Sequence, residues 1–200
     1  MGIIMIEDHL KILKGEKKKV RRLQLTIAII ILILLFLPLL WQLERGIMVA
    51  SYLVVESELQ SNVIRFNLLS MLRKKPLTLG QALDIMDAIM LQDKIPIPII
   101  LAIIEQESEF YPKAVSVKGA KGLGQLMPAV WKRQIRDPFD SQSNVVASIN
   151  HLTYLKTQLG DWRRVFRAYV AGEAYANSTS MDWYAEAVMK KVKKWEKVWE

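Results

Sequence analysis

The sequence predicts an all-α protein in which a transmembrane helix and a helical stalk precede one globular helical domain. Three observations predict this class. An uncharged apolar block lies near the N-terminus, apolar residues recur at helical spacing through much of the remaining chain, and no segment shows the alternating polarity of a strand. No internal repeat with a period of about 20 to 50 residues is visible. We therefore expect one core and an N-terminal appendage.

The apolar block at residues 23–43 contains no charged residue. About 20 helical residues match the hydrocarbon thickness of a bilayer, whereas a buried core helix of that length normally keeps a polar face. A cleaved signal peptide is the closer alternative. Its apolar run is usually about 7 to 15 residues long and ends at small residues, but here Trp41, Gln42, Glu44 and Arg45 follow. We therefore expect a retained membrane anchor.

The charges on either side of this block predict its orientation. Residues 1–22 carry seven Lys and Arg against three Asp and Glu, whereas Arg45 stands alone on the other side until Arg65. Basic flanks stay on the cytoplasmic side of a membrane. We expect a single-pass protein with a cytoplasmic N-terminus and with the residues after 43 outside the cytoplasm.

The net charge of +8 does not indicate nucleic-acid binding. The globular part, Thr78 to Glu200, has 16 basic and 14 acidic residues, so it lacks the strong basic excess of a nucleic-acid-binding domain. The chain has no cysteine, and its two histidines, His9 and His151, have no carboxylates or thiols at ligand spacing. We expect no bound metal and no nucleic-acid partner.

Residues 44–77 are predicted to form the helical stalk or linker, because no Gly or Pro follows Gly46 until Pro76. The residue before a proline disfavours helix, which puts the start of the domain, residues 78–200, just after Pro76. Thr78 and Gln81 form a capping-box pattern that begins the first helix of the domain. Pro98 is suited to the first residue of the next helix.

Three more helices are expected, and a glycine-rich segment separates them from the first two. The segment 115–124 predicts either a short hairpin or an irregular loop, because it is rich in glycine. The helices are expected over Gln142–Leu159, Trp162–Val170 and Ser180–Trp199, with caps supplied by Asp140 or Ser141 and by Gly160.

Glu107 is the candidate catalytic residue, because it lies at the polar end of an otherwise apolar helix. A carboxyl that is partly buried has a raised pKa and can donate a proton near neutral pH. Glycoside cleavage needs such an acid, since the departing sugar oxygen must be protonated. Position alone does not separate this reading from a glutamate on a solvated helix face.

The residues that follow Glu107 supply the stronger signal, because many of them match one pattern at fixed spacing. The matching residues are Glu107, Ser108, Phe110, Pro112, Ala114, Ser116, Gly119, Ala120, Gly122, Leu123, Gln125 and Pro128. This string resembles the soluble lytic transglycosylase (SLT) family, a lysozyme-like group that acts on peptidoglycan. The resemblance extends over about Ile95 to Trp195 and includes RAYVAGE at 167–173, where Val170 replaces the family's usual Asn.

The resemblance implies a lysozyme-like fold, no cofactor and a one-carboxylate mechanism on peptidoglycan strands. Glu107 would protonate the glycosidic oxygen after N-acetylmuramic acid, the substrate's acetamido group would stabilise the sugar cation, and the C6 hydroxyl would close a 1,6-anhydro ring. The substrate-binding residues implied by the resemblance are Ser108, Ser116, Gly122, Gln125, Met127, Tyr169 and Tyr184. Gly124 stands where the family often has Met, which predicts a wider groove.

Two other functions stay open. A hydrolytic muramidase of the same superfamily would need a second carboxylate, for which Asp137, Asp140 and Glu173 are candidates. An inactive component that only holds glycan is supported by Val170.

The resemblance places the domain in the periplasm, anchored in a bacterial inner membrane or carried by a phage in its virion membrane. A larger phage or secretion assembly is a further hypothesis.

Overall fold

The structure is a computed structural model that describes residues 2–197, with side chains from residue 15 onward. It confirms the predicted all-α class, because every named element in the described part of the chain is a helix. The chain divides into two compact units, residues 1–61 and 62–200. Each unit is described by itself below.

The first unit consists of the greater part of α1, which runs from Gly2 to Leu72 and contains Pro38. The predicted anchor at residues 23–43 lies inside this helix, and its apolar side chains are exposed on all sides. Within the described residues α1 is the one helix that is long and apolar enough to cross a membrane, with a mean hydropathy of 2.9 in its most apolar window. Length and composition are the whole basis of that finding.

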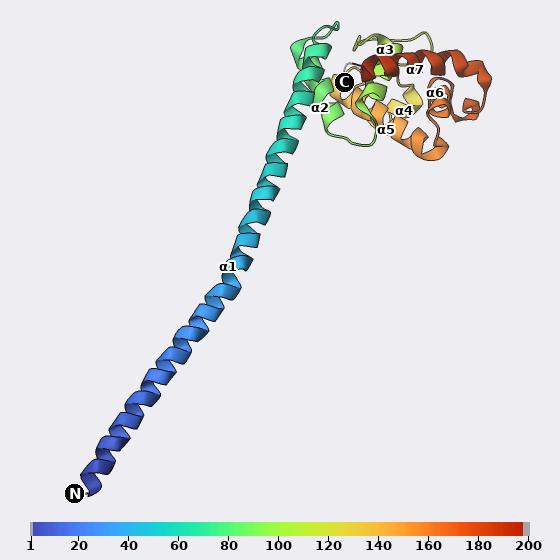
Figure 1. Ribbon diagram of the computed structural model, residues 1–200. Coiled ribbons are helices and arrows are strands. Elements are labelled where there is room, and N and C mark those ends of the chain that lie inside the picture. The colour runs from blue at the N-terminus through green and yellow to red at the C-terminus, as the bar shows by residue number, and fades with distance from the viewer. Residues whose placement is uncertain (1, 198–200) are drawn as a thin grey trace. The chain divides into compact units, whose positions relative to one another are not determined.

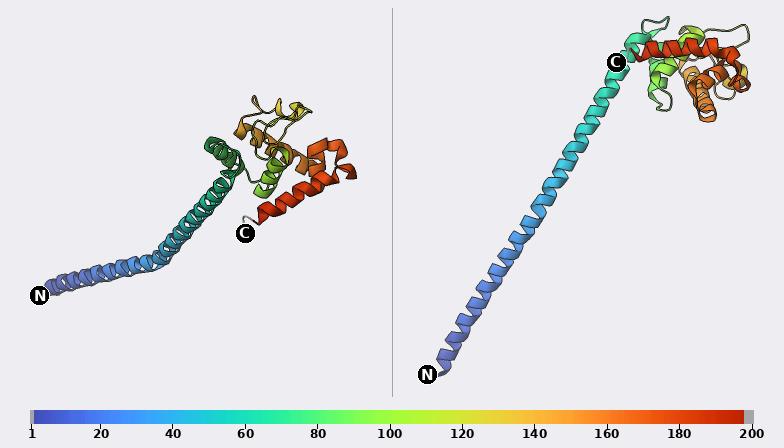
Figure 2. Two further views of the ribbon diagram at one scale, coloured as in Figure 1. Left: turned by 90° about the horizontal axis from the view of Figure 1, so that it is seen from above. Right: turned by 45° about the vertical axis from the view of Figure 1, so that its right-hand side comes forward.

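The second unit is a bundle of short helices (Figure 1). Its elements are α2 (Leu79–Met90), α3 (Ile97–Ser108), α4 (Pro128–Trp131), α5 (Ser141–Leu159), α6 (Trp162–Ala171), the 3-10 turns η1 (Glu173–Tyr175) and η2 (Thr179–Met181), and α7 (Asp182–Glu196). Six consecutive residues of α3, from Ile99 to Ile104, are buried, so this helix is covered on every face. Helix α7 packs along α3 and α6 (Figure 2), and α2 packs on α5.

The helix ends follow the local sequence closely. Thr78 and Gln81 form both hydrogen bonds of the predicted capping box at the start of α2. Asp140 caps α5 by accepting a hydrogen bond from the Ser143 amide, and Gly160 ends that helix with a φ of +72°. The expected last helix is divided, because η2 precedes α7. Helix α3 begins at Ile97, one residue before Pro98, which therefore lies inside its first turn.

The second unit begins earlier in the sequence than the expected boundary just after Pro76. It starts at Asn62 and therefore includes the last turns of α1. Leu68 and Leu72 are completely buried in its core, and Arg65 forms an ion pair with Asp87 at 3.3 Å. Those two leucines belong to the globular fold, although they lie in the segment expected to form the stalk.

The segment between α3 and α4 is an irregular loop held by two isolated antiparallel bridges, Val115 with Lys121 and Lys121 with Leu126. The chain leaves α3 through Glu109 and Phe110, whose φ angles of +50° and +65° lie in the left-handed region. The Phe110 side chain is fully buried, and burial of this large ring offsets the backbone strain. The loop alternative of the sequence prediction is therefore the observed one.

Candidate active site

The carboxyl group of Glu107 lies on the last turn of α3, partly buried and in contact with α7. The Tyr184 hydroxyl donates a hydrogen bond to Oε1 of Glu107. Burial raises the pKa of Glu107 from 4.5 to about 7, and the Tyr184 hydrogen bond opposes part of that rise because it stabilises the ionised form. A carboxyl with this pKa can give up a proton and take one back at neutral pH.

The buried Tyr184 and the half-buried Tyr169 flank this carboxyl. Tyr184 comes from α7, and Tyr169 comes from α6 and donates a hydrogen bond to the Gly124 carbonyl at 2.8 Å. Burial, followed by the nearby charge of Glu107, raises the pKa of each tyrosine above its ordinary value of 10.0. Both phenols therefore stay protonated and act as hydrogen-bond donors at neutral pH.

Asn144 anchors the glycine-rich loop to α5. Its Oδ1 accepts a hydrogen bond from the Gly124 amide at 2.8 Å, and its Nδ2 donates to the Pro138 and Lys121 carbonyls at 2.8 and 3.2 Å. The residue is completely buried, so these bonds also satisfy polar atoms that have no access to water. Asn144 lies in the helix predicted over Gln142–Leu159, and its buried amide holds the loop in position.

Gly122 and Gly124 are required by close packing. Gly122 has a φ of +79°, and a Cβ there would collide with the Pro138 carbonyl and the Asn144 amide. A Cβ on Gly124 would collide with Ser148 and would lie 3.0 Å from the Tyr169 hydroxyl. The expectation that Gly124 widens the groove is therefore wrong, because Ser148 and Tyr169 fill the space that a side chain would occupy.

Three of the expected substrate-binding side chains already have partners within the protein. The Ser108 hydroxyl donates to the Ile104 carbonyl at 3.1 Å, and the Ser116 hydroxyl accepts from the Ala120 amide at 3.0 Å. Nε2 of Gln125 donates to the carbonyls of Ala114 and Gly122, each at 3.0 Å. In this structure these groups hold the end of α3 and the loop, and their contact with a substrate stays a prediction.

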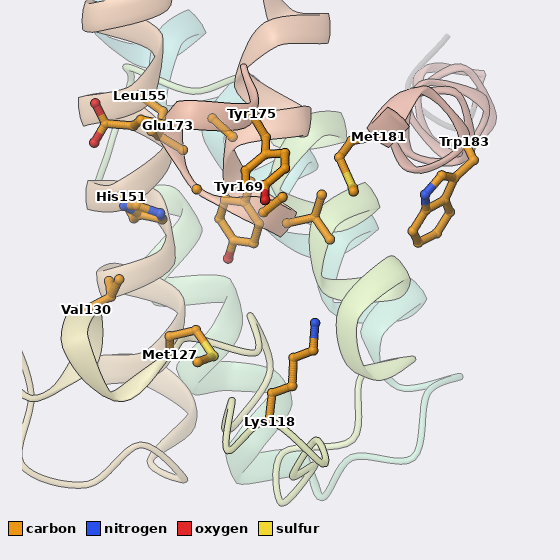
Figure 3. A pocket seen from close by; sticks show the side chains of 14 residues that line it. Lys118, Met127, Val130, His151, Leu155, Tyr169, Glu173, Tyr175, Met181 and Trp183 are labelled. Carbon is orange, nitrogen blue, oxygen red and sulfur yellow. The ribbon is translucent and has the colours of Figure 1, made fainter. Parts of the chain in front are cut away.

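A cleft of about 630 Å³ lies beside this arrangement (Figure 3). Met127 and Tyr169, two of the expected substrate-binding residues, line it together with Val170. The other lining residues are Lys118, Val130, His151, Leu155, Ala168, Ala171, Gly172, Glu173, Tyr175, Met181 and Trp183. Glu107 does not line the cleft itself; Tyr169 is the lining residue whose pKa its charge raises.

His151 and Lys118 line the cleft, although no local sequence pattern indicated a role for either, and Glu173, one of the three candidate second carboxylates, lines it as well. The His151 ring packs against Tyr169 with centroids 5.4 Å apart, and burial lowers its pKa although the charge of Glu173 opposes that change. His151 is therefore neutral at neutral pH. In the described part of the chain no group of three or more His, Cys, Asp or Glu could hold a metal ion.

The second unit is thus an all-helical domain with one partly buried glutamate close to a cleft. Residues 84–194 match the family described as "Transglycosylase SLT domain", and the chain belongs to that family.

Two solved structures resemble this one. The 70 kDa soluble lytic transglycosylase Slt70 from Escherichia coli has a TM-score of 0.47 and 23% identity, and the match covers 50% of this chain and 22% of that one. An inactive mutant of lytic transglycosylase Slt from Pseudomonas aeruginosa has a TM-score of 0.46 and 22% identity, over 50% and 21% of the two chains. This chain thus spans about a fifth of the length of those proteins.

Proposed function

We propose that this protein is a membrane-anchored lytic transglycosylase that cleaves the β-1,4 bond between N-acetylmuramic acid and N-acetylglucosamine in peptidoglycan. The observation that carries the proposal is the Glu107 carboxyl, whose pKa burial raises to about 7 and which Tyr184 orients beside the cleft. Membership of the SLT domain family supports the choice of peptidoglycan as substrate.

One carboxyl is sufficient for the proposed reaction. Protonated Glu107 gives its proton to the glycosidic oxygen as the bond to C1 of the muramic acid breaks. The substrate's acetamido group stabilises the positive charge at C1. The C6 hydroxyl then bonds to C1 and returns a proton to Glu107, so the product carries a 1,6-anhydro ring and no water is consumed.

The second carboxylate that hydrolysis would need has one candidate left in the cleft. Asp137 accepts a hydrogen bond from the Phe139 amide at 2.9 Å, and Asp140 caps α5. Both carboxylates therefore accept hydrogen bonds from backbone amides. Glu173 lines the cleft and is the residue on which a hydrolytic muramidase would depend. This observation keeps hydrolysis as the second candidate function.

The proposed cellular arrangement rests on α1. Its segment at residues 23–43 would span the inner membrane, with the basic N-terminus in the cytoplasm and residues 62–200 in the periplasm or, for a phage, outside the virion membrane. A role in opening the wall for a phage or secretion assembly predicts that the full chain co-purifies with other proteins. A membrane protein that migrates as an isolated chain would contradict that role.

Digestion of purified sacculi by the full chain in detergent, followed by mass spectrometry of the sugar ends, tests the reaction. We expect 1,6-anhydro ends, whereas reducing ends that incorporate oxygen from isotopically labelled water would establish hydrolysis. Glu107→Gln should lower the rate at least about 100-fold, because it removes the proton donor while keeping its shape. Glu109→Gln is the matched control, since Glu109 is the exposed neighbour.

A glycan-binding component without activity is the remaining alternative, and Val170 is the observation that favours it. Val170 lines the cleft and is 38% exposed, so the family's amide is replaced by an apolar surface that a sugar would meet. If the full chain binds sacculi but releases no fragments, and Val170→Asn then releases them, this alternative is correct. Release of anhydro fragments by the unaltered chain excludes it.

A further inference from the structure

The cleft has walls that suit sugar rings and a single positive charge that sugar rings do not need. Met127, Tyr175 and Trp183 are 44%, 47% and 60% exposed, so they present apolar and aromatic surface to a bound strand. Such surfaces cover the carbon-rich faces of a ligand, while a few polar groups set its orientation. Lys118 is the one cation among the residues that line this cleft, since burial keeps His151 neutral.

The Lys118 backbone is held in place while its side chain extends. Lys118 lies in a turn closed by a hydrogen bond from the Gly119 amide to the Ser116 carbonyl at 2.9 Å, and Gly119 has a φ of +86°. The Ser116 hydroxyl holds the next amide, that of Ala120, at 3.0 Å. Figure 3 shows the side chain rising from this loop into the cleft, with its nitrogen toward the side that carries Tyr175 and Met181.

No carboxylate among the side chains that the structure describes forms an ion pair with this ammonium group. Among residues 15–197 no salt bridge includes Lys118. Glu173, the one carboxylate that lines the cleft, lies across it in Figure 3. By contrast, Lys75 and Lys194 both pair with Glu105, at 3.5 and 2.7 Å. The charge of Lys118 is therefore directed at whatever occupies the cleft.

We propose that Lys118 is a specificity-determining residue that binds a carboxylate of the peptide attached to the muramic acid, so that the protein prefers strands that carry peptides. This inference rests on the proposed function. In an intact strand the sugars are neutral, because their amino groups are acetylated and the muramic lactyl group is amide-linked to the peptide. The carboxylates near the strand therefore belong to the peptide, and an ammonium group in the cleft distinguishes them from the sugar.

Peptide-bearing strands with neutralised carboxylates test the proposal. Their free amines are first acetylated and their carboxylates are then converted to methylamides with a carbodiimide. For the full chain in detergent at low salt, kcat/KM should be about 3-fold higher on strands that are only acetylated than on strands that are acetylated and then methylamidated, the size expected of a solvent-exposed ion pair. This ratio should fall to about one in Lys118→Met and stay near its original value in Lys118→Arg. It should also shrink at high salt.

Lys113→Met is the matched control, because Lys113 is an exposed lysine of the same loop that does not line the cleft. Equal ratios in Lys113→Met and Lys118→Met would overturn the proposal, since the effect would then come from net charge. Strands stripped by an amidase carry a free lactyl carboxylate in place of the peptide. If Lys118→Met affects these strands as strongly, the carboxylate that is bound is not that of the peptide, and the proposal is wrong. A full chain that cleaves no strand at all contradicts the proposed function instead.

Discussion

At the scale of single residues, the buried carboxyl of Glu107 lowers the stability of the folded protein when it is ionised, and the proposed chemistry requires that carboxyl. The raised pKa means that the folded state holds its proton more tightly than the unfolded chain does. The stability associated with this proton is complete below the ordinary pKa of 4.5 and is lost as pH rises to about 7. A shift of this size corresponds to roughly 3 kcal/mol at alkaline pH.

Glu107→Gln should therefore make the second unit more stable at pH 8 and change it little at pH 4, because the amide does not ionise. Thermal melting followed by tryptophan fluorescence reports on this unit through Trp162 and Trp195 in its helices. Glu109→Gln is the control for removing one negative charge at an exposed position. A melting-temperature difference that is the same at both pH values would contradict the buried, protonated state of Glu107.

At the scale of elements, the glycine-rich loop depends on α5 more than on its own turns. Asn144→Ala removes an acceptor and a donor that serve the Gly124 amide and the Pro138 carbonyl, both of which are then left unpaired in the interior. We expect a loss of roughly 2 to 4 kcal/mol in stability and a lower rate of strand cleavage, because Gly124 also positions Tyr169.

Asn150→Ala on the same helix provides the comparison. Asn150 is exposed, and its one side-chain hydrogen bond, to Gln134 at 3.3 Å, lies on the surface. Urea denaturation of the two variants should show little change in the free energy of unfolding for Asn150→Ala. Equal losses in the two variants would mean that the buried amide of Asn144 does not hold the loop.

At the scale of the whole molecule, we expect the globular unit to need the last turns of α1 for its stability. A fragment that begins at Thr78 lacks Leu68 and Leu72, which are completely buried in the core. Burying two leucine side chains contributes roughly 3 to 6 kcal/mol, so this fragment should be much less stable than one that begins at Asn62. Thermal melting of the two fragments measures the difference in stability. Equal melting temperatures would mean that the globular domain begins at Thr78.

The sequence by itself determined the features that depend on neighbouring residues. The capping box at Thr78 and the end of α5 at Gly160 are local patterns that the structure confirms, and of the two candidate caps for α5, Asp140 and Ser141, the structure shows Asp140. The uncharged block at residues 23–43 likewise needs no partner to be recognised as apolar. The spacing of residues from Glu107 to Pro128 was sufficient to indicate the family, and the match over residues 84–194 confirms it.

Only the tertiary structure decided what these residues contact. Glu107 meets Tyr184 across 77 positions of sequence, and Tyr169 meets Gly124 across 45. Packing of α7 against α3, and of α6 against α5 and α7, creates these pairs, and no local pattern specifies which side chains then face one another. The tertiary structure also places Ser148 and Tyr169 beside Gly124 and buries Leu68 and Leu72 in the core. It also leaves Lys118 extended into the cleft, because no carboxylate of the described chain is brought within reach of it.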